Sequence, residues 1–326
     1  MHFLVSSELL TGENEHRLHD FAKRFFEDRI YVEFSDIDIA QEWVDSLEAR
    51  SQELWSRLLR QSVLLKSHHN MKRVYLAANK IRVRHDLTES VWNGNVTLTL
   101  DDACMVLDHV IMVGLENSRN DRDFLLTLLP LRSRERFLAL VKTGRLTFIG
   151  GGGNGELKVQ LIEKVEDPSF RLLSWIMFDN DARFPGHLPL PTEELIRVCT
   201  DHDLTFHCLE RRCVENYITR QIYNLAFPGV IGAKVEAIFG LSPEQSKYFN
   251  FKKGFSNSRE EDNALYSNLS GPQKTALSKG FGDKLASEVY NTEIRQDIHE
   301  IFCASGVLAE FGNKLAHLEQ LLGRPV

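Results

Sequence analysis

The stretch Trp175-Ile176-Met177-Phe178-Asp179-Asn180-Asp181 decides the interpretation of this chain. It closes an apolar run that begins at Leu172, and such a run predicts a strand buried on both faces, as in a parallel sheet. Side chains two apart on a strand point the same way, so Asp179 and Asp181 are expected to converge where the strand ends. Ligands of open α/β sheets bind at that edge, and paired carboxylates there suit a hard divalent cation. A solvated strand-to-loop turn is the alternative.

Two apolar runs upstream have related endings. Residues 108–115 stop at Glu116, and a helical pattern follows from about Asp121; Asp121 and Asp123 fall in its first turn, where carboxylates suit the helix dipole. Residues 145–149 run into four consecutive glycines, Gly150 to Gly153, and a helical pattern follows at 156–163. These glycines allow either close backbone approach to a ligand or simply a tight turn. No Gly-Lys-Ser/Thr follows them, so they do not form the phosphate loop of nucleotidases.

The centre of the chain alternates between strand and helix. A helix is expected over 192–200 and a fourth strand over 204–209, which leads into Glu210-Arg211-Arg212-Cys213-Val214-Glu215-Asn216-Tyr217. Alternating strands and helices imply right-handed crossovers and a parallel sheet. The sequence therefore predicts an α/β fold whose acidic residues follow the first and third strands of this sheet.

This order of motifs resembles the Toprim domain of topoisomerases, bacterial primases and several nucleases. The family pattern is a Glu after the first strand, a glycine-bearing second crossover and Asp-x-Asp after the third strand. The glycine turn and the Leu209-Glu210 to Glu215-Asn216-Tyr217 segment are most similar to nucleases of the overcoming-lysogenization-defect (OLD) type and related phage-defence effectors. The resemblance covers about residues 106 to 220. The chain departs from it at Asn117, which replaces a glycine, and at Asn120, which stands where an acid is usual.

The resemblance implies a Mg²⁺- or Mn²⁺-dependent site with five carboxylate ligands. Asp179 and Asp181 are expected to bind the ions, and Glu116 is either a further ligand or the general base that orients the attacking water. Asp121 is expected to take the acid role left by Asn120, with Asp123 as the alternative. Glu215 is either an outer ligand or a helix-start carboxylate that faces solvent. Such ions lower the pKa of bound water and stabilise charge on the attacking and leaving oxygens.

A lysine that stabilises the transition state is common in OLD-type nucleases. Lys253, in the aromatic-flanked turn Phe249-Asn250-Phe251-Lys252-Lys253-Gly254-Phe255, is the residue we expect in this role, because bases stack on aromatic rings beside phosphate-binding lysines. The other candidates are Lys252, Lys279 and Lys284. Arg211 and Arg212 either grip the phosphate backbone or form a solvated face.

Composition bounds the remaining possibilities. The 326 residues fit roughly two domains, and a hydrophobic content of 43% is ample for a packed core. A net charge of −7 argues against a general electrostatic binder of nucleic acid but not against a nuclease, because bound cations offset clustered acids. Five cysteines without Cys-x-x-Cys are expected to be reduced, as in a cytoplasmic protein. Neither a signal peptide nor a membrane-spanning run is expected.

Three regions are expected along the chain. Residues 1–105 are predicted to form an α+β region with short strands at 3–5 and 31–34, and residues 106–225 the Toprim-like catalytic domain. Asp36 is expected to begin one long helix or two, and Lys80, Arg82 and Arg84 to share one face of a strand that either contacts phosphates or is simply exposed. Residues 226–326 are predicted to be mainly helical. A leucine-rich stripe on the last helix either packs in the core or docks on a partner or a second copy.

The leading hypothesis is a metal-dependent nuclease that cleaves DNA or RNA as the effector of a bacterial antiviral defence system. Related effectors often work beside an ATPase; this chain has no phosphate-loop motif, so the ATPase would be a separate subunit. One alternative is a nucleotide-sugar glycosyltransferase that binds Mn²⁺ through Asp-x-Asp; it predicts a nucleotide-binding βα unit at the N-terminus, which residues 1–35 do not suggest. The other alternative is a non-catalytic Toprim scaffold subunit.

Overall fold

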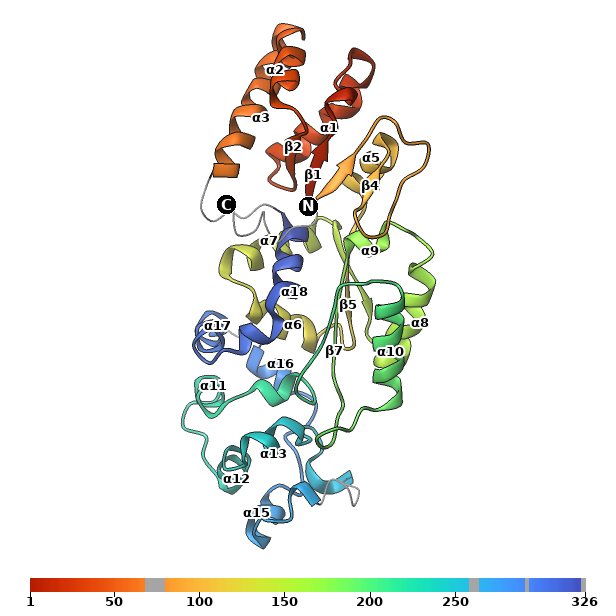
Figure 1. Ribbon diagram of the computed structural model, residues 1–326. Helices are drawn as coiled ribbons and strands as arrows, with labels where there is room; N and C mark the ends of the chain where they lie inside the picture. The colour runs from red at the N-terminus through yellow and green to blue at the C-terminus, as the bar shows by residue number, and fades with distance from the viewer. Residues whose placement is uncertain (68–79, 258–263, 291–292, 324–326) are drawn as a thin grey trace. The chain divides into compact units, whose positions relative to one another are not determined.

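The chain folds into two compact units, each built on a parallel sheet flanked by helices. The computed structural model describes residues 1–67, 80–257, 264–290 and 293–323 (Figure 1). The first unit comprises Met1–Ile111, Arg136–Leu146 and Asn313–Val326, and the second comprises Met112–Glu135 and Thr147–Gly312. The predicted α/β class is therefore confirmed.

The first unit contains a four-stranded sheet in the order β2-β1-β3-β4, and its paired strands are parallel. The expected α+β arrangement of residues 1–105 is wrong, because the paired strands are parallel: crossover helices join β1 to β2 and β2 to β3, and a segment without a helix joins β3 to β4. Strands of only two to four residues left too little hydrophobic pattern to reveal this. The elements are β1 (His2–Val5), α1 (Glu15–Phe26), β2 (Tyr31–Phe34), α2 (Ile37–Asp45), α3 (Ala49–Ser67), β3 (Ile81–Val83), β4 (Thr97–Leu98) and α5 (Leu100–Asp108).

Local signals in this unit act as the sequence predicts. The Asp36 side chain caps α2 by accepting hydrogen bonds from the backbone N–H groups of Asp38 and Ile39. Separate helices α2 and α3 follow, so the alternative of two helices is correct. Two residues of the basic face form ion pairs, since Lys80 Nζ lies 2.8 Å from Glu33 Oε2 and Arg84 pairs with Asp86, and Arg82 is exposed.

The second unit contains a four-stranded sheet in the order β6-β5-β7-β8. Its core strand β7 is buried at every residue, as expected for a parallel sheet covered on both faces. The strands are β5 (Ile111–Leu115), β6 (Leu146–Gly150), β7 (Ser174–Phe178) and β8 (Phe206–Cys208). The helices that follow β5 in the chain are α6 (Asn120–Leu128), α7 (Leu131–Lys142), α8 (Asn154–Lys164), α9 (Phe170–Leu173), α10 (Leu190–Asp201), α11 (Arg220–Ala226), α12 (Ala233–Phe239), α13 (Pro243–Tyr248), α15 (Gly271–Ala276), α16 (Leu285–Tyr290), α17 (Arg295–Ala304) and α18 (Val307–Leu322).

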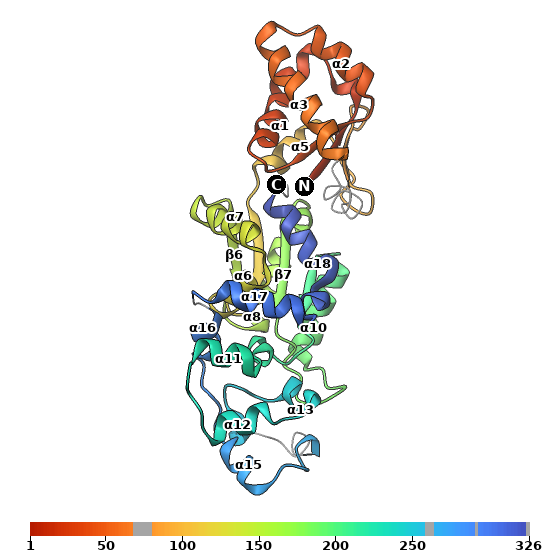
Figure 2. The ribbon, with the colours of Figure 1, turned by 90° about the vertical axis from the view of Figure 1, so that its left-hand side faces the viewer.

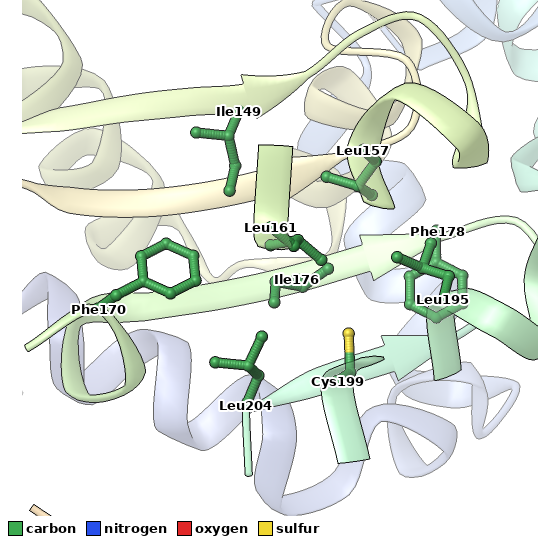
Figure 3. Close-up of a cluster of buried hydrophobic side chains, with 9 residues drawn as sticks. All are labelled: Ile149, Leu157, Leu161, Phe170, Ile176, Phe178, Leu195, Cys199 and Leu204. Atoms are coloured by element: carbon green, nitrogen blue, oxygen red, sulfur yellow. The ribbon is translucent and has the colours of Figure 1, made fainter. Parts of the chain in front are cut away.

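Helices α8 and α10 cover one face of this sheet (Figure 1). Alternate residues of β7, Ile176 and Phe178, point to that face and are fully covered. They join a cluster of buried side chains from the neighbouring strand and helices (Figure 3): Ile149, Leu157, Leu161, Phe170, Leu195, Cys199 and Leu204. This cluster holds the strand whose end carries Asp179.

The opposite face is covered by α6 and the C-terminal helices. Phe124 of α6 lies at the centre of an aromatic cluster with Tyr217, Tyr290, Phe302 and Phe311. Helices α16, α17 and α18 therefore pack against α6 through these rings. Helices α12, α13 and α15 gather at one end of this unit in both views (Figure 1 and Figure 2). The leucine-rich stripe of α18 is mostly buried, as core packing predicts.

The strand order places a topological switch point between β5 and β7. The chain leaves β5 for β6 on one side and then crosses to β7 on the other, so the two crossovers diverge at the carboxyl ends of β5 and β7. Such a divergence opens the crevice where doubly wound sheets bind ligands. In the described residues, no helix is long and apolar enough to cross a membrane.

The glycine run at the end of β6 is required by close packing at this crevice. Gly150 has φ of +91°, and a Cβ there would lie 2.3 Å from the carbonyl oxygen of Leu115. Gly153 donates its backbone N–H to the carbonyl oxygen of Glu116 at 3.2 Å. The turn is therefore pressed against the segment that carries Glu116.

We predict that Gly150→Ala destabilises the protein by about 1–3 kcal/mol or more, because it adds left-handed backbone strain to a backbone clash. Thermal unfolding measures the effect. Gly155→Ala is the matched control, because Gly155 lies in α8 with open space around it, and alanine in a helix is expected to stabilise by about 0.5–1 kcal/mol. Equal melting temperatures for the two variants would contradict the assigned packing.

Candidate functional site

Glu116 and Asp179 meet at the switch point. Leu115 of β5 pairs with Met177 of β7, so the two acids follow neighbouring strand ends. The Asp179 backbone N–H donates to Glu116 Oε2 at 3.2 Å. Asp179 is buried, and its carbonyl oxygen accepts from Asn154 Nδ2 at 3.3 Å, so the first residue of α8 also fixes this strand end. The sequence correctly predicted that acids from the first and third strands lie together.

Asp121 joins the pair from the first turn of α6. Its Oδ2 accepts a hydrogen bond of 2.7 Å from the backbone N–H of Asn117. Asn117 in turn accepts from the N–H groups of Arg119 and Asn120 through its side-chain oxygen. Asn117 therefore orders the turn before α6 through its side chain, and its backbone N–H positions Asp121.

Asp123 is directed elsewhere. Its Oδ1 lies 3.3 Å from an arginine nitrogen of Arg295 and 3.7 Å from one of Arg122. These arginines stabilise its charge, and its carboxylate is part of the packing between α6 and α17. Of the two alternatives left open by the sequence, Asp121 is the one beside Glu116 and Asp179.

Glu215 and Lys252 complete the cluster. Glu215 has no exposed surface, and Lys252 Nζ lies 3.5 Å from its Oε1. Neither carboxylate oxygen of Glu215 accepts a hydrogen bond within the described residues. The alternative that Glu215 faces solvent is therefore excluded. Lys252 is the cation of this cluster.

Burial and nearby like charges raise the pKa values of three acids in the cluster. The pKa of Glu116 is raised to about 8 by burial, and by the charges of Asp181 and Asp121. The pKa of Asp121 is raised to about 7 by burial, although the Asn117 N–H and Lys252 oppose the rise. The pKa of Asp179 lies well above its ordinary value because of burial and the charges of Glu116 and Asp121. Like charges held in low dielectric are the common cause.

Lys252 responds in the opposite sense. Burial alone would lower its pKa, but Cys213, Glu215, Asp179 and Asp121 together raise the pKa above the ordinary value of lysine. The ammonium group is therefore held charged. It offsets part of the repulsion among the acids.

Asp181 reaches the cluster by a different route from the one expected. Strand β7 ends at Phe178, and Asp181 has a left-handed backbone with φ of +58°, so strand alternation does not extend to it. Its backbone N–H donates to the carbonyl oxygen of Arg212 at 2.9 Å. Asp181 is half-buried and is near enough to Glu116 to raise its pKa. Backbone strain at a non-glycine residue is typical of functional sites.

The remaining basic candidates lie outside the cluster of buried acids. Lys253, Lys279 and Lys284 are exposed, and the Lys253 backbone N–H donates to Asn250 Oδ1. Arg211 donates to the carbonyl oxygen of Asn216 and lies over the Tyr217 ring, and Arg212 donates to the carbonyl oxygen of Tyr248. The two arginines therefore brace the loop after β8.

Lys252 is positioned by a close backbone crossing. The carbonyl oxygens of Phe251 and Lys252 accept from the N–H groups of Phe281 and Gly282. A Cβ at Gly280 would lie 2.3 Å from the Lys252 carbonyl oxygen, so the crossing requires glycine there. This contact between residues about thirty positions apart in sequence left no local signal, which explains why the sequence favoured its neighbour Lys253.

Glu310 of α18 anchors the loop that carries Glu215. Its Oε1 accepts from His207 Nε2 at 2.9 Å, Tyr217 Oη at 2.6 Å and the Glu210 N–H at 2.9 Å. Burial alone would raise the pKa of Glu310, but these hydrogen bonds outweigh it and lower the pKa. Sequence analysis missed this residue because its partners lie about 90 to 100 positions away.

The carboxylate oxygens of the cluster are suitable ligands for a hard cation, but their present arrangement is not that of a metal site. Carboxylate oxygens are what Mg²⁺ and Mn²⁺ prefer, and Asp179 Oδ1 and both Glu215 oxygens are buried without hydrogen bonds. Among the described residues, however, no three His, Cys, Asp or Glu side chains form a group that could hold one ion as they stand. Glu116 and Asp121 each direct an oxygen at a backbone N–H.

Comparison with known proteins adds no relative: no family model, curated protein or solved structure matches this chain. The functional argument therefore depends on the geometry of the cluster.

All five cysteines are free thiols, as expected.

We predict that the metal-free cluster destabilises the protein as pH rises. Unfolded Asp and Glu titrate near pH 4, whereas Glu116 and Asp121 titrate near 8 and 7 in the folded protein. Their protonated forms favour the folded state below the unfolded values, and that contribution is lost as pH rises through the folded values. Asp179→Asn removes one like charge, so in EDTA it should stabilise the protein more at pH 8.5 than at pH 5.5, by on the order of 1 kcal/mol.

Thermal unfolding of both proteins at both pH values measures this difference. Glu163→Gln is the matched control, because Glu163 is an exposed acid on α8. Its effect on stability should be small and the same at both pH values. If Asp179→Asn behaves like this control, the acids do not repel one another as assigned.

Proposed function

We propose that this protein is a Toprim-type, Mg²⁺- or Mn²⁺-dependent nuclease that cleaves phosphodiester bonds in DNA or RNA. The observation that carries the proposal is the gathering of three buried carboxylates, Asp121, Asp179 and Glu215, around the half-buried Glu116 at the carboxyl ends of a parallel sheet. Such a cluster is unfavourable without cations. The raised pKa values of Glu116, Asp121 and Asp179 are typical of catalytic and metal-binding sites.

The same residues suggest how cations are accepted. Asp179 Oδ1 and the Glu215 oxygens lack hydrogen bonds and are available as ligands. Glu116 and Asp121 would exchange a backbone N–H for a cation, and Lys252 would move from Glu215. Metal binding therefore requires these side chains to rotate. The phosphate of the nucleic acid would supply further oxygen ligands to the ions.

Each residue has a distinct role in this proposal. Asp179, Asp181, Asp121 and Glu215 hold the ions, and Glu116 either binds the first ion or orients the attacking water. The bound ions would supply an activated water and stabilise charge on the leaving oxygen. We assign the transition-state cation to Lys252 instead of Lys253, because Lys252 is the lysine held against the acids.

The resemblance to OLD-type nucleases extends this proposal to a biological setting. The protein would serve as the effector of a bacterial antiviral defence system, and an ATPase on a separate chain would control it. Co-purification with an ATPase encoded by an adjacent gene tests that part of the proposal.

One observation favours the glycosyltransferase as a second candidate. Residues 1–35 do not suggest a nucleotide-binding βα unit from their sequence, yet β1, α1 and β2 form a parallel βαβ unit. This alternative predicts Mn²⁺-dependent binding of a nucleoside diphosphate sugar. It leaves the burial of Asp121 and Glu215 beside Glu116 without a role.

Calorimetric titration with Mn²⁺ is the decisive first experiment. Wild type should bind, and Asp179→Asn, Asp181→Asn and Glu116→Gln should bind at least tenfold more weakly, with Glu163→Gln as the control. Cleavage of plasmid DNA and of structured RNA is then measured with and without Mn²⁺. Absence of Mn²⁺ binding at millimolar concentration, with or without an oligonucleotide, would favour a scaffold role.

We predict that Lys252→Met lowers kcat by about 10²–10³-fold, as expected on removing one group that stabilises developing charge. Lys253→Met is the matched control, because Lys253 is the next residue in the chain and its side chain is exposed. This variant should change kcat by less than about threefold. Cleavage rates at saturating substrate measure both. A larger loss in Lys253→Met than in Lys252→Met would reverse the assignment.

A further inference from the structure

A tight turn with two aromatic rings, Phe184 to His187, begins three positions after Asp181. His187 donates its backbone N–H to the carbonyl oxygen of Phe184 at 3.1 Å, with Pro185 and Gly186 between them. Gly186 has φ of +79°. Proline in the second position and a left-handed glycine in the third are the pattern of a type II turn. The turn is therefore defined by its own backbone chemistry.

The two rings form a small platform on this turn. The Phe184 and His187 ring centroids lie 4.9 Å apart with an interplanar angle of 37°. His187 Nδ1 accepts the backbone N–H of Arg183 at 3.3 Å, so in the neutral ring the proton lies on Nε2. Both residues are half-buried and Pro185 and Gly186 are exposed. The rings are thus fixed in orientation at the surface, with an N–H donor at their edge.

The distance from the acids suits one nucleotide. Phe184 lies three positions after Asp181, a span of at most about 10 Å. A phosphate held at the acids would have its neighbouring sugar and base within that span. Aromatic rings stack on bases of any sequence, but only where the base face is not already covered by its neighbours in a duplex.

The charge of the protein points the same way. A net charge of −7 gives little general attraction to a long phosphate backbone. Arg211 and Arg212, which precede Glu215, donate to backbone carbonyl oxygens. Affinity for nucleic acid must then come largely from the metal site and from contacts to bases.

We propose that Phe184 and His187 stack on an unpaired nucleobase next to the scissile phosphate, so that the substrate is single-stranded or locally unpaired DNA or RNA. This inference rests on the proposed nuclease function and names its substrate class. Phe184 supplies the stacking face. His187 adds a hydrogen bond from Nε2 to the base or its phosphate.

The test is fluorescence anisotropy of labelled 12-nucleotide probes in Ca²⁺: oligo-dT, oligo-rU, an abasic oligomer of equal length and a hairpin duplex. Wild type should bind oligo-dT or oligo-rU about tenfold more tightly than the abasic and duplex probes, the amount expected for one stacked base. The tighter of the first two identifies DNA or RNA as the substrate. Phe184→Ala should abolish the preference over the abasic probe, and Phe184→Trp should retain it.

The abasic probe provides the internal control, because its affinity should be the same for wild type and Phe184→Ala. Equal discrimination by wild type and Phe184→Ala, or tighter binding of the duplex, would overturn the proposal. Phe184→Trp and His187→Ala keep the test informative if Phe184→Ala fails to fold. Mn²⁺ titration of wild type separates the two proposals: binding of Mn²⁺ without base preference refutes only the platform, and base preference without Mn²⁺ binding refutes the nuclease.

Discussion

Repulsion among buried carboxylates is the constraint on which the second unit depends. Glu116, Asp121 and Asp179 each have a raised pKa because burial removes them from water and other carboxylates lie nearby. Proteins avoid such clusters unless cations or hydrogen bonds compensate, since an uncompensated buried charge costs several kcal/mol. The hydrogen bonds from Asp179 and Asn117 compensate in part. The unsatisfied oxygens of Asp179 and Glu215 are what remains.

This constraint explains why helices beyond the sheet belong to the site. Lys252 reaches Glu215 only because the chain crosses itself at Gly280, and Glu310 fixes the loop before Glu215 through His207 and Tyr217. The aromatic cluster around Phe124 then holds these helices against α6, which carries Asp121. A minimal sheet with its acids would lack both the compensating cation and the support for Glu215.

The sequence revealed the parts of the site that depend on short-range pattern. Strand β7 and the acids after β5 and β7 follow from apolar runs that end in carboxylates, and the turn at Gly150 follows from four adjacent glycines. Lys252 could not be distinguished from Lys253, because only a distant backbone crossing separates a buried lysine from an exposed one. The parallel first sheet was missed for a related reason: its strands are too short to show the period from which direction and burial are inferred.

The two sheets allow topology and chemistry to be separated. Both have the same kind of strand order, with the first strand inside and the second at an edge, so both have a switch point. In the first unit the groups at that point satisfy one another: Ser7 Oγ lies 2.9 Å from Ser35 Oγ and accepts the Asp36 N–H, and the Ser6 N–H donates to the Val83 carbonyl oxygen. In the second unit Asp179 Oδ1 and both carboxylate oxygens of Glu215 are buried without a hydrogen bond among the described residues. Fold alone does not assign function. The second switch point is the candidate for chemistry because carboxylate oxygens of Asp179 and Glu215 are buried there without hydrogen bonds, beside the charged Lys252.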